Sequence, residues 1–144
     1  MRQPYVFPQT PVTEYAYNNA FRNQREPMSP TSLHDLTQRV RQFAAERDWD
    51  QFHTPKNLAM ALVAEAGELV AEFQWLTAAQ SAAPTPQQLD RIRAECADVL
   101  IYLARLADQL GFDLLAAAEA KIEDNARRYP VEKARGSSRK YTEY

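Results

Sequence analysis

Cysteine is nearly absent from this chain, which holds a single thiol, Cys96. One thiol cannot form an internal disulfide bond, so a reducing compartment, the cytoplasm, is the expected location. The chain also lacks an apolar segment near its start and any uncharged run of roughly 18 or more apolar residues. Because its net charge is only −2, neither a nucleic-acid polymer nor a membrane is an expected partner. What remains is a soluble globular protein of 144 residues, the size of one domain.

Basic residues are missing from the middle of the chain. Between Asn57 and Asp90 there is no Lys, Arg or His. Glu65, Glu68 and Glu72 lie in this gap, so none has a cation three or four places away on its own helix. Their charge must be balanced by another segment, by solvent or by a metal ion.

Alternation of apolar and polar residues is missing as well, so β-strands are not expected. Residues with helix-capping side chains instead precede four segments with helical spacing. The expected starts are Ser32, Thr54-Pro55, Thr85-Pro86 and Asp113, and the helices cover about 33–46, 55–76, 86–110 and 114–129. Gly111 is the expected C-cap of the third helix, and Pro130 ends the fourth. Short connections between the helices predict an all-α four-helix bundle.

Two segments outside these helices differ in composition from them. Residues 1–30 hold five of the nine prolines and several aromatic residues without any period, which predicts an extended arm that is disordered or docks on a neighbouring subunit. Residues 31–130 form the expected helical domain, with the candidate catalytic residues. Residues 131–144 form a basic tail. From residue 127 to the end of the sequence there are six Lys or Arg and only two acidic residues. Such a tail is solvated, or it donates charge-assisted hydrogen bonds to phosphate.

Two acid pairs with helical spacing lie inside the most apolar segments. They are Glu65/Glu68 and Glu95/Asp98. If the second and third helices pack antiparallel, the two pairs can face each other, and four carboxylates in an apolar setting repel one another. A divalent cation removes this repulsion, and oxygen ligands favour Mg²⁺ first and Mn²⁺ second. Because Mg²⁺ in proteins tends to bind together with substrate phosphates, the pattern indicates a phosphorylated substrate.

Two alternatives to a magnesium site apply to the same acids. Arg or Lys from another helix could pair with them, and Arg91, four residues before Glu95, is one such cation. A di-iron or di-manganese centre would need Glu-x-x-His on two helices. The two histidines, His34 and His53, do not follow a Glu at that spacing, which argues against such a centre.

Aromatic and basic residues near the acid pairs suggest contacts with a nucleotide. Trp49 and Trp75 flank the second helix and could stack on a base, or both could belong to the core. His53 could bond a ligand or cap its turn. Three further residues share one side of the fourth helix and suit a polyphosphate: Lys121, Asn125 and Arg128.

The chain resembles the MazG-like superfamily of all-α nucleoside triphosphate pyrophosphohydrolases, and within it the dCTP-hydrolysing enzymes. The resemblance covers about residues 31–144. The motifs that carry it are Phe43-Ala-Ala-Glu-Arg-Asp-Trp49, Gln51-Phe-His53, Glu65-Ala-Gly-Glu68, Phe73-Gln-Trp75, Asp98-Val-Leu-Ile-Tyr102, Arg128-Tyr-Pro130 and Ser137-Ser-Arg-Lys-Tyr141.

This resemblance implies a homotetramer that hydrolyses dCTP, including 5-modified forms, to dCMP and diphosphate. It implies Mg²⁺ on Glu65, Glu68, Glu95 and Asp98. A carboxylate that the metal does not fully engage, Glu65 or Glu68, could then accept the proton from water. The resemblance also implies that Trp49 and Trp75 enclose the base, with His53 in the segment around it, and that Tyr102 contacts the deoxyribose. Lys121, Asn125 and Arg128 correspond to phosphate-side positions.

One position departs from the pattern of the superfamily. Val40 stands where relatives often carry a base-contacting histidine, and a valine side chain offers no donor or acceptor. The same chemistry on dUTP or a damaged nucleotide therefore stays open as an alternative. A separate alternative, which does not depend on Val40, is a non-catalytic helical scaffold that oligomerises through its apolar faces.

Overall fold

The computed structural model describes residues 30–143, and every regular element in this part is helical. The long helices are α1 (Leu33–Ala45), α2 (Pro55–Ala71), α4 (Pro86–Leu110) and α5 (Leu114–Arg128). The short ones are α3 (Ala78–Ser81), α6 (Val131–Ala134) and the 3-10 turn η2 (Tyr141–Glu143). The expected all-α class is confirmed for this part of the chain, and the arm expected at the N-terminus lies outside the described residues, apart from Pro30.

The four long helices begin at the capping residues that the sequence predicts. The hydroxyls of Ser32, Thr54 and Thr85 each accept a hydrogen bond from the backbone N–H three residues later. The Asp113 carboxylate accepts two such bonds at the start of α5. Gly111 ends α4 with φ +71°, a left-handed conformation that glycine adopts without strain.

Helix α2 ends earlier than its apolar pattern predicts. The sequence indicated a helix to about Leu76, but the last helical residue is Ala71 and Glu72 is the C-cap. The backbone N–H groups of Phe73 and Gln74 both donate to one carbonyl, that of Val70, which tightens the final turn. Thr77 is the extended N-cap of α3, so the chain has to leave the helical conformation before it.

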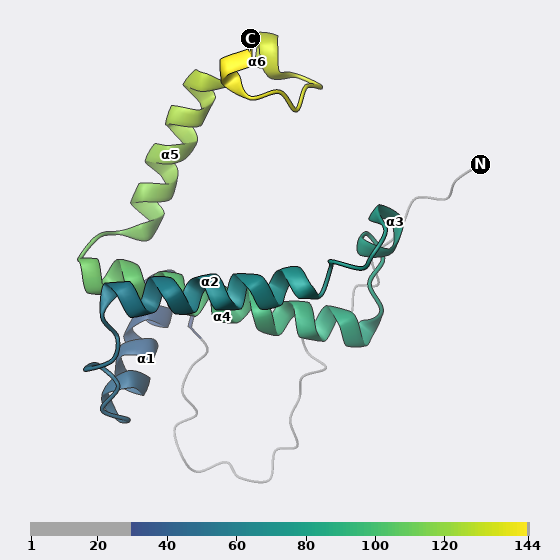
Figure 1. Ribbon diagram of the computed structural model, residues 1–144. Helices are drawn as coiled ribbons and strands as arrows, with labels where there is room; N and C mark the ends of the chain where they lie inside the picture. Colours follow the sequence, from purple (N-terminus) through teal and green to yellow (C-terminus); the bar gives the residue numbers. More distant parts are fainter. Residues whose placement is uncertain (1–29, 144) are drawn as a thin grey trace.

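Helices α2 and α4 pack along each other in opposite directions, and α1 packs across the C-terminal half of α4 (Figure 1). The buried apolar residues lie where these three helices meet: Ala44, Leu58, Ala104 and Ala107. This arrangement places the middle of α2 beside the middle of α4. No helix in residues 30–143 is long and apolar enough to span a bilayer.

The closed four-helix bundle that the sequence predicted is not formed within one chain. Helix α5 leaves the end of α4 and leads away from the α2–α4 pair (Figure 1). Its apolar residues Leu115 and Ile122 are therefore 62% and 69% exposed. Helix α2, which the sequence indicated to be buried nearly all round, likewise leaves Met60 and Val63 65% and 71% exposed. A helical period shows that a helix has an apolar face, but it does not say which molecule covers that face.

Candidate metal centre

Three carboxylates from two helices converge at the middle of the α2–α4 pair. Glu65 of α2 and Glu95 and Asp98 of α4 each place an oxygen within 4.8 Å of the others. Glu95 and Asp98 lie one turn apart on α4, so they point to the same side, and the antiparallel packing brings Glu65 opposite them. All three side chains are half-buried. The face-to-face arrangement that the sequence predicted is thus found for these three acids.

Glu68 stands next to this group rather than in it. It lies one turn along α2 from Glu65 and is exposed, and its oxygens are not within the 4.8 Å group. Its charge nevertheless acts on the group, because it contributes to raising the pKa of both Glu65 and Glu95.

The three grouped acids have no cationic partner among residues 30–143. No ion pair in this part of the chain involves Glu65, Glu95 or Asp98. Partial burial raises the pKa of Glu65, and the charges of Asp98, Glu68 and Glu95 raise it further. Partial burial also raises the pKa of Glu95, followed by the charges of Glu68, Asp98 and Glu72. A group of acids that repel one another and lack an ion-pair partner is suited to a divalent cation.

The alternative to a metal ion, an ion pair with arginine, is found at Glu72 and not at the grouped acids. Arg91, considered from the sequence as a partner of Glu95, instead places its Nε 2.9 Å from each oxygen of Glu72. This pair joins the end of α2 to the start of α4. Glu72 is therefore neutralised by arginine, whereas Glu65 and Glu95 are not.

The two tryptophans are exposed, so the interpretation of both as core residues is wrong for this chain. Trp49 is 44% exposed and Trp75 is 86% exposed. Trp49 precedes α2 and Trp75 follows it, and a helix of 17 residues is about 25 Å long. Trp49 and Trp75 therefore lie beyond opposite ends of α2, too far apart for one chain to bring both to one base. Trp49 instead contacts Phe43 and His53 edge to face, with ring centroids 5.7 and 6.2 Å away.

His53 takes part in a polar network instead of capping the turn, which Thr54 does. The Nε of Arg105 lies 3.4 Å from the Nδ1 of His53. Burial lowers the pKa of His53, and the charge of Arg105 lowers it further, against a smaller opposite effect of Asp50.

Tyr102 and the α5 residues differ in their relation to the carboxylates. Tyr102 is half-buried on α4, one turn beyond Asp98 and on the same side of the helix. Lys121 and Arg128 place their nitrogens 3.7 and 2.9 Å from the carboxylate of Asp124 on their own helix. Asn125 beside them is exposed. Because α5 leads away from the α2–α4 pair, these residues do not line the carboxylate group of the same chain (Figure 1).

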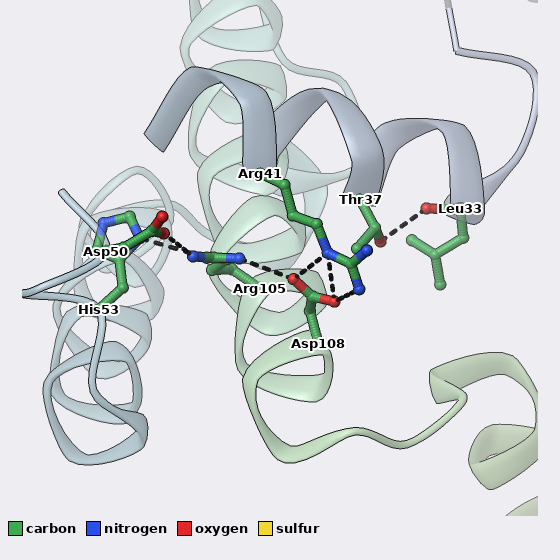
Figure 2. Close-up of polar contacts among 7 residues, drawn as sticks. All are labelled: Leu33, Thr37, Arg41, Asp50, His53, Arg105 and Asp108. Carbon is green, nitrogen blue, oxygen red and sulfur yellow. Dashed lines mark hydrogen bonds and ion pairs between the residues drawn. The ribbon is translucent and has the colours of Figure 1, made fainter. Parts of the chain in front are cut away.

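A second charged cluster was not anticipated from the sequence. It joins Arg41 of α1, Asp50 of the α1–α2 connection, and Arg105 and Asp108 of α4 (Figure 2). Arg105 is only 4% exposed. The available signal was the spacing of Arg105 and Asp108 by three residues within an apolar part of α4, and the sequence does not reveal that Asp50 and Arg41 meet them there.

Comparisons with known proteins point in one direction. Residues 60–144 match the model of the MazG-like family. The human protein dCTP pyrophosphatase 1 is 47% identical over 114 residues, which cover 78% of this chain and 67% of the human protein. The Mus musculus protein of the same name is 44% identical over 125 residues, covering 85% of this chain and 71% of the mouse protein. The crystal structure of a pyrophosphatase from Archaeoglobus fulgidus superposes with a TM-score of 0.65 at 35% identity, covering 68% of this chain and 92% of that one. This chain therefore belongs to the MazG-like family, as the resemblance of its motifs suggested.

Proposed function

We propose that this chain is a nucleotide diphosphatase that hydrolyses dCTP, including 5-modified forms, to dCMP and diphosphate. The observation that carries the proposal is the group of Glu65, Glu95 and Asp98, which has no cationic partner among residues 30–143. Relatives that are 44–47% identical are named dCTP pyrophosphatase 1. The proposed role is the removal of unwanted deoxynucleotides from the cellular pool.

The acids fit a hard divalent ion, Mg²⁺ or alternatively Mn²⁺. Their ligands are carboxylate oxygens only, which is the donor set that these ions prefer. Glu65, Glu95 and Asp98 would hold the ion, with Glu68 completing the set from the neighbouring turn of α2. When bound, the ion neutralises phosphate charge and makes water more acidic.

The side chains around the metal would move the proton and position the nucleotide. Water attacks the triphosphate, the anhydride bond between the α- and β-phosphates breaks, and diphosphate leaves. Glu65 or Glu68, whichever carboxylate the ion does not fully engage, would accept the proton from the attacking water. Tyr102, one turn from Asp98, would contact the deoxyribose.

A second copy of the chain would complete the base pocket. Trp49 and Trp75 of one chain lie beyond opposite ends of α2, so the two indoles could enclose one base only if they came from different copies. The large exposed apolar side chains of α2 and α5 support such an assembly, which we propose to be a homotetramer. Lys121, Asn125 and Arg128 on the projecting α5 would then reach the phosphates bound by another copy.

Base preference and location are also part of the proposal. Val40 is half-buried on α1 and cannot hydrogen-bond a base, so the pocket would tolerate other pyrimidines such as uracil in addition to cytosine. The single thiol, Cys96, is exposed and not in a disulfide, which suits the reducing cytoplasm.

The reaction is tested by incubating the purified protein with Mg²⁺ and each common deoxynucleoside triphosphate, followed by chromatography of the products. We expect dCMP and diphosphate from dCTP. Release of a nucleoside diphosphate and orthophosphate would contradict the reaction type. A preference for a different base would favour the dUTP or damaged-nucleotide alternative. No turnover, together with no thermal stabilisation by Mg²⁺, would favour the scaffold.

Removal of single carboxylates tests the site itself. We expect Glu65→Gln and Glu95→Gln each to lower kcat by at least about a hundredfold, because each removes one charge from the metal and phosphate site. The control is Glu119→Gln, which removes an exposed carboxylate of α5. Near-normal turnover in both site variants would remove the carboxylate group from the mechanism.

A further inference from the structure

Arg105 is a buried cation whose bonds reach outside its own helix. Its Nη1 lies 2.7 Å from an oxygen of Asp108, one turn further along α4. Its Nη2 bonds the carboxylate of Asp50, and its Nε lies 3.4 Å from the Nδ1 of His53 (Figure 2). Asp50 and His53 both belong to the connection between α1 and α2. One guanidinium therefore ties this connection to α4.

The inner end of this network is fixed by two helices. Arg41 of α1 places its Nε 2.8 Å from both oxygens of Asp108, whose side chain is only 5% exposed. The carboxylate of Asp108 is thus held between α1 and α4, and its position does not depend on the loop. Because two arginines face two aspartates, the charges balance, and within residues 30–143 no buried polar side-chain atom lacks a hydrogen-bond partner.

The outer end of the network holds the loop that carries Trp49. Trp49 directly precedes Asp50, and its ring lies 6.2 Å from that of His53. The loop is not helical, and Asp48 lies at φ +53°. Backbone hydrogen bonds hold part of it, because the N–H of Trp49 donates to the carbonyl of Ala44 and the N–H of His53 donates to that of Trp49. The backbone and the ring of Phe43 support one side of Trp49. Asp50 and His53, the two side chains that Arg105 binds, connect the other side of the loop to α4.

We propose that Arg105 is a positioning residue that holds the Trp49 loop in place for the nucleotide base. It does not contact the reacting phosphates, and it acts through Asp50 and His53. Its role in catalysis depends on the proposed function, because that function assigns the base to Trp49, whereas its role in ordering the loop does not. The planar guanidinium can bond all three partners at once, which a lysine ammonium cannot do in the same geometry.

The first test follows the loop without any substrate. In a Trp75→Phe background Trp49 is the only tryptophan, and acrylamide quenching of its fluorescence reports its exposure. We expect Arg105→Met and Asp50→Asn each to raise the quenching constant by about twofold at unchanged helix content by circular dichroism, because the indole loses its support. Asp50→Asn is the safer variant for folding, since that side chain is 55% exposed.

The matched control is Asp90→Asn, which breaks an exposed ion pair with Arg93 on α4 away from the loop. It should leave the fluorescence of Trp49 unchanged. If Asp50→Asn and a folded Arg105→Met quench like the parent protein, the proposal is overturned, whether or not the protein hydrolyses dCTP.

The second test measures kinetics in proteins that retain Trp75. We expect Asp50→Asn and Arg105→Lys to raise KM for dCTP about tenfold with kcat changed much less, because misplacing a binding loop by an ångström is costly while the metal-binding acids stay in place. A merely structural role would lower thermal stability without this split between KM and kcat. A fall in kcat at constant KM would overturn the positioning role, and an absence of all turnover in the parent protein would instead contradict the proposed function.

Discussion

Glu65 and Glu95 carry an electrostatic cost that the folded chain does not offset by itself. Their pKa values are raised above the usual 4.5 by partial burial and by neighbouring acids. In the pH range between this value and the raised one, the folded protein binds more protons than the unfolded chain. The free energy of unfolding therefore falls as the pH rises through this range, and the whole cost is present once the pH exceeds the raised pKa.

We expect Glu95→Gln to unfold at a higher temperature than the parent protein at neutral pH in the absence of divalent ions, because the substitution removes one repelling charge. Addition of Mg²⁺ should raise the unfolding temperature of the parent by several degrees and that of the variant much less. Differential scanning fluorimetry with and without Mg²⁺, repeated below pH 4.5, measures both effects.

At the lower pH the advantage of Glu95→Gln over the parent protein should shrink, since the glutamate is then protonated in both states. Glu119→Gln serves again as the control, because its carboxylate is exposed and is not one of the grouped acids. Equal stabilisation of all three proteins by Mg²⁺ would show that the ion binds elsewhere.

The helices depend on the local chemistry at their ends. Helix α4 carries two of the three grouped acids and is 25 residues long, and it starts with a capping box formed by Thr85 and Gln88. Both side chains bond backbone N–H groups that the helix itself leaves unpaired.

Removal of the Thr85 hydroxyl should therefore destabilise the protein in a predictable way. We expect Thr85→Ala to lower the free energy of unfolding by about 1 kcal/mol, whereas Thr85→Ser keeps the oxygen and should change it little. Urea unfolding followed by circular dichroism measures the difference between the two variants. Equal stability would mean that the first turn of α4 does not contribute to the folded state.

At the scale of the whole molecule, the chain buries few of its apolar side chains. In residues 30–143 the buried apolar residues are Ala44, Leu58, Ala104 and Ala107, of which only leucine is large. Fifteen large hydrophobic or aromatic side chains in the same part of the chain are exposed, including those on the projecting α5. Such a surface is typical of a subunit that is covered by other copies.

A charged substitution on α5 tests this assembly. Ile122 is 69% exposed in the single chain, so Ile122→Asp should leave the isolated subunit folded but shift sedimentation velocity toward the monomer, because a carboxylate would be buried between copies. Turnover of dCTP should fall with it, since a monomer cannot bring both tryptophans to one base. Gln87→Glu, which adds the same charge to an exposed position at the start of α4, should change neither property. A sedimentation coefficient that Ile122→Asp leaves unchanged would place the subunit contact elsewhere.

Much of the fold could be predicted because it depends on short-range chemistry. The capping residues Ser32, Thr54, Thr85 and Asp113 act within three residues, so the start of each of the four long helices was found at the expected place. The predicted end of α2 was wrong by several residues. The apolar period continues past Ala71, but the chain has to leave the helical conformation before Thr77, which is the extended N-cap of the next helix.

Spacing along one chain was enough to predict the long helices, the lack of cations around Glu65 and Glu68, and the side of each helix on which the acids lie. Only the tertiary structure decided that Arg91 binds Glu72, that Arg105 binds the loop before α2, and that α5 leaves the helix pair. These contacts depend on which residues distant in the chain meet, and the packing of apolar faces decides that. Because the hydrophobic effect is not directional, the helical period shows where an apolar face lies but not which helix will cover it.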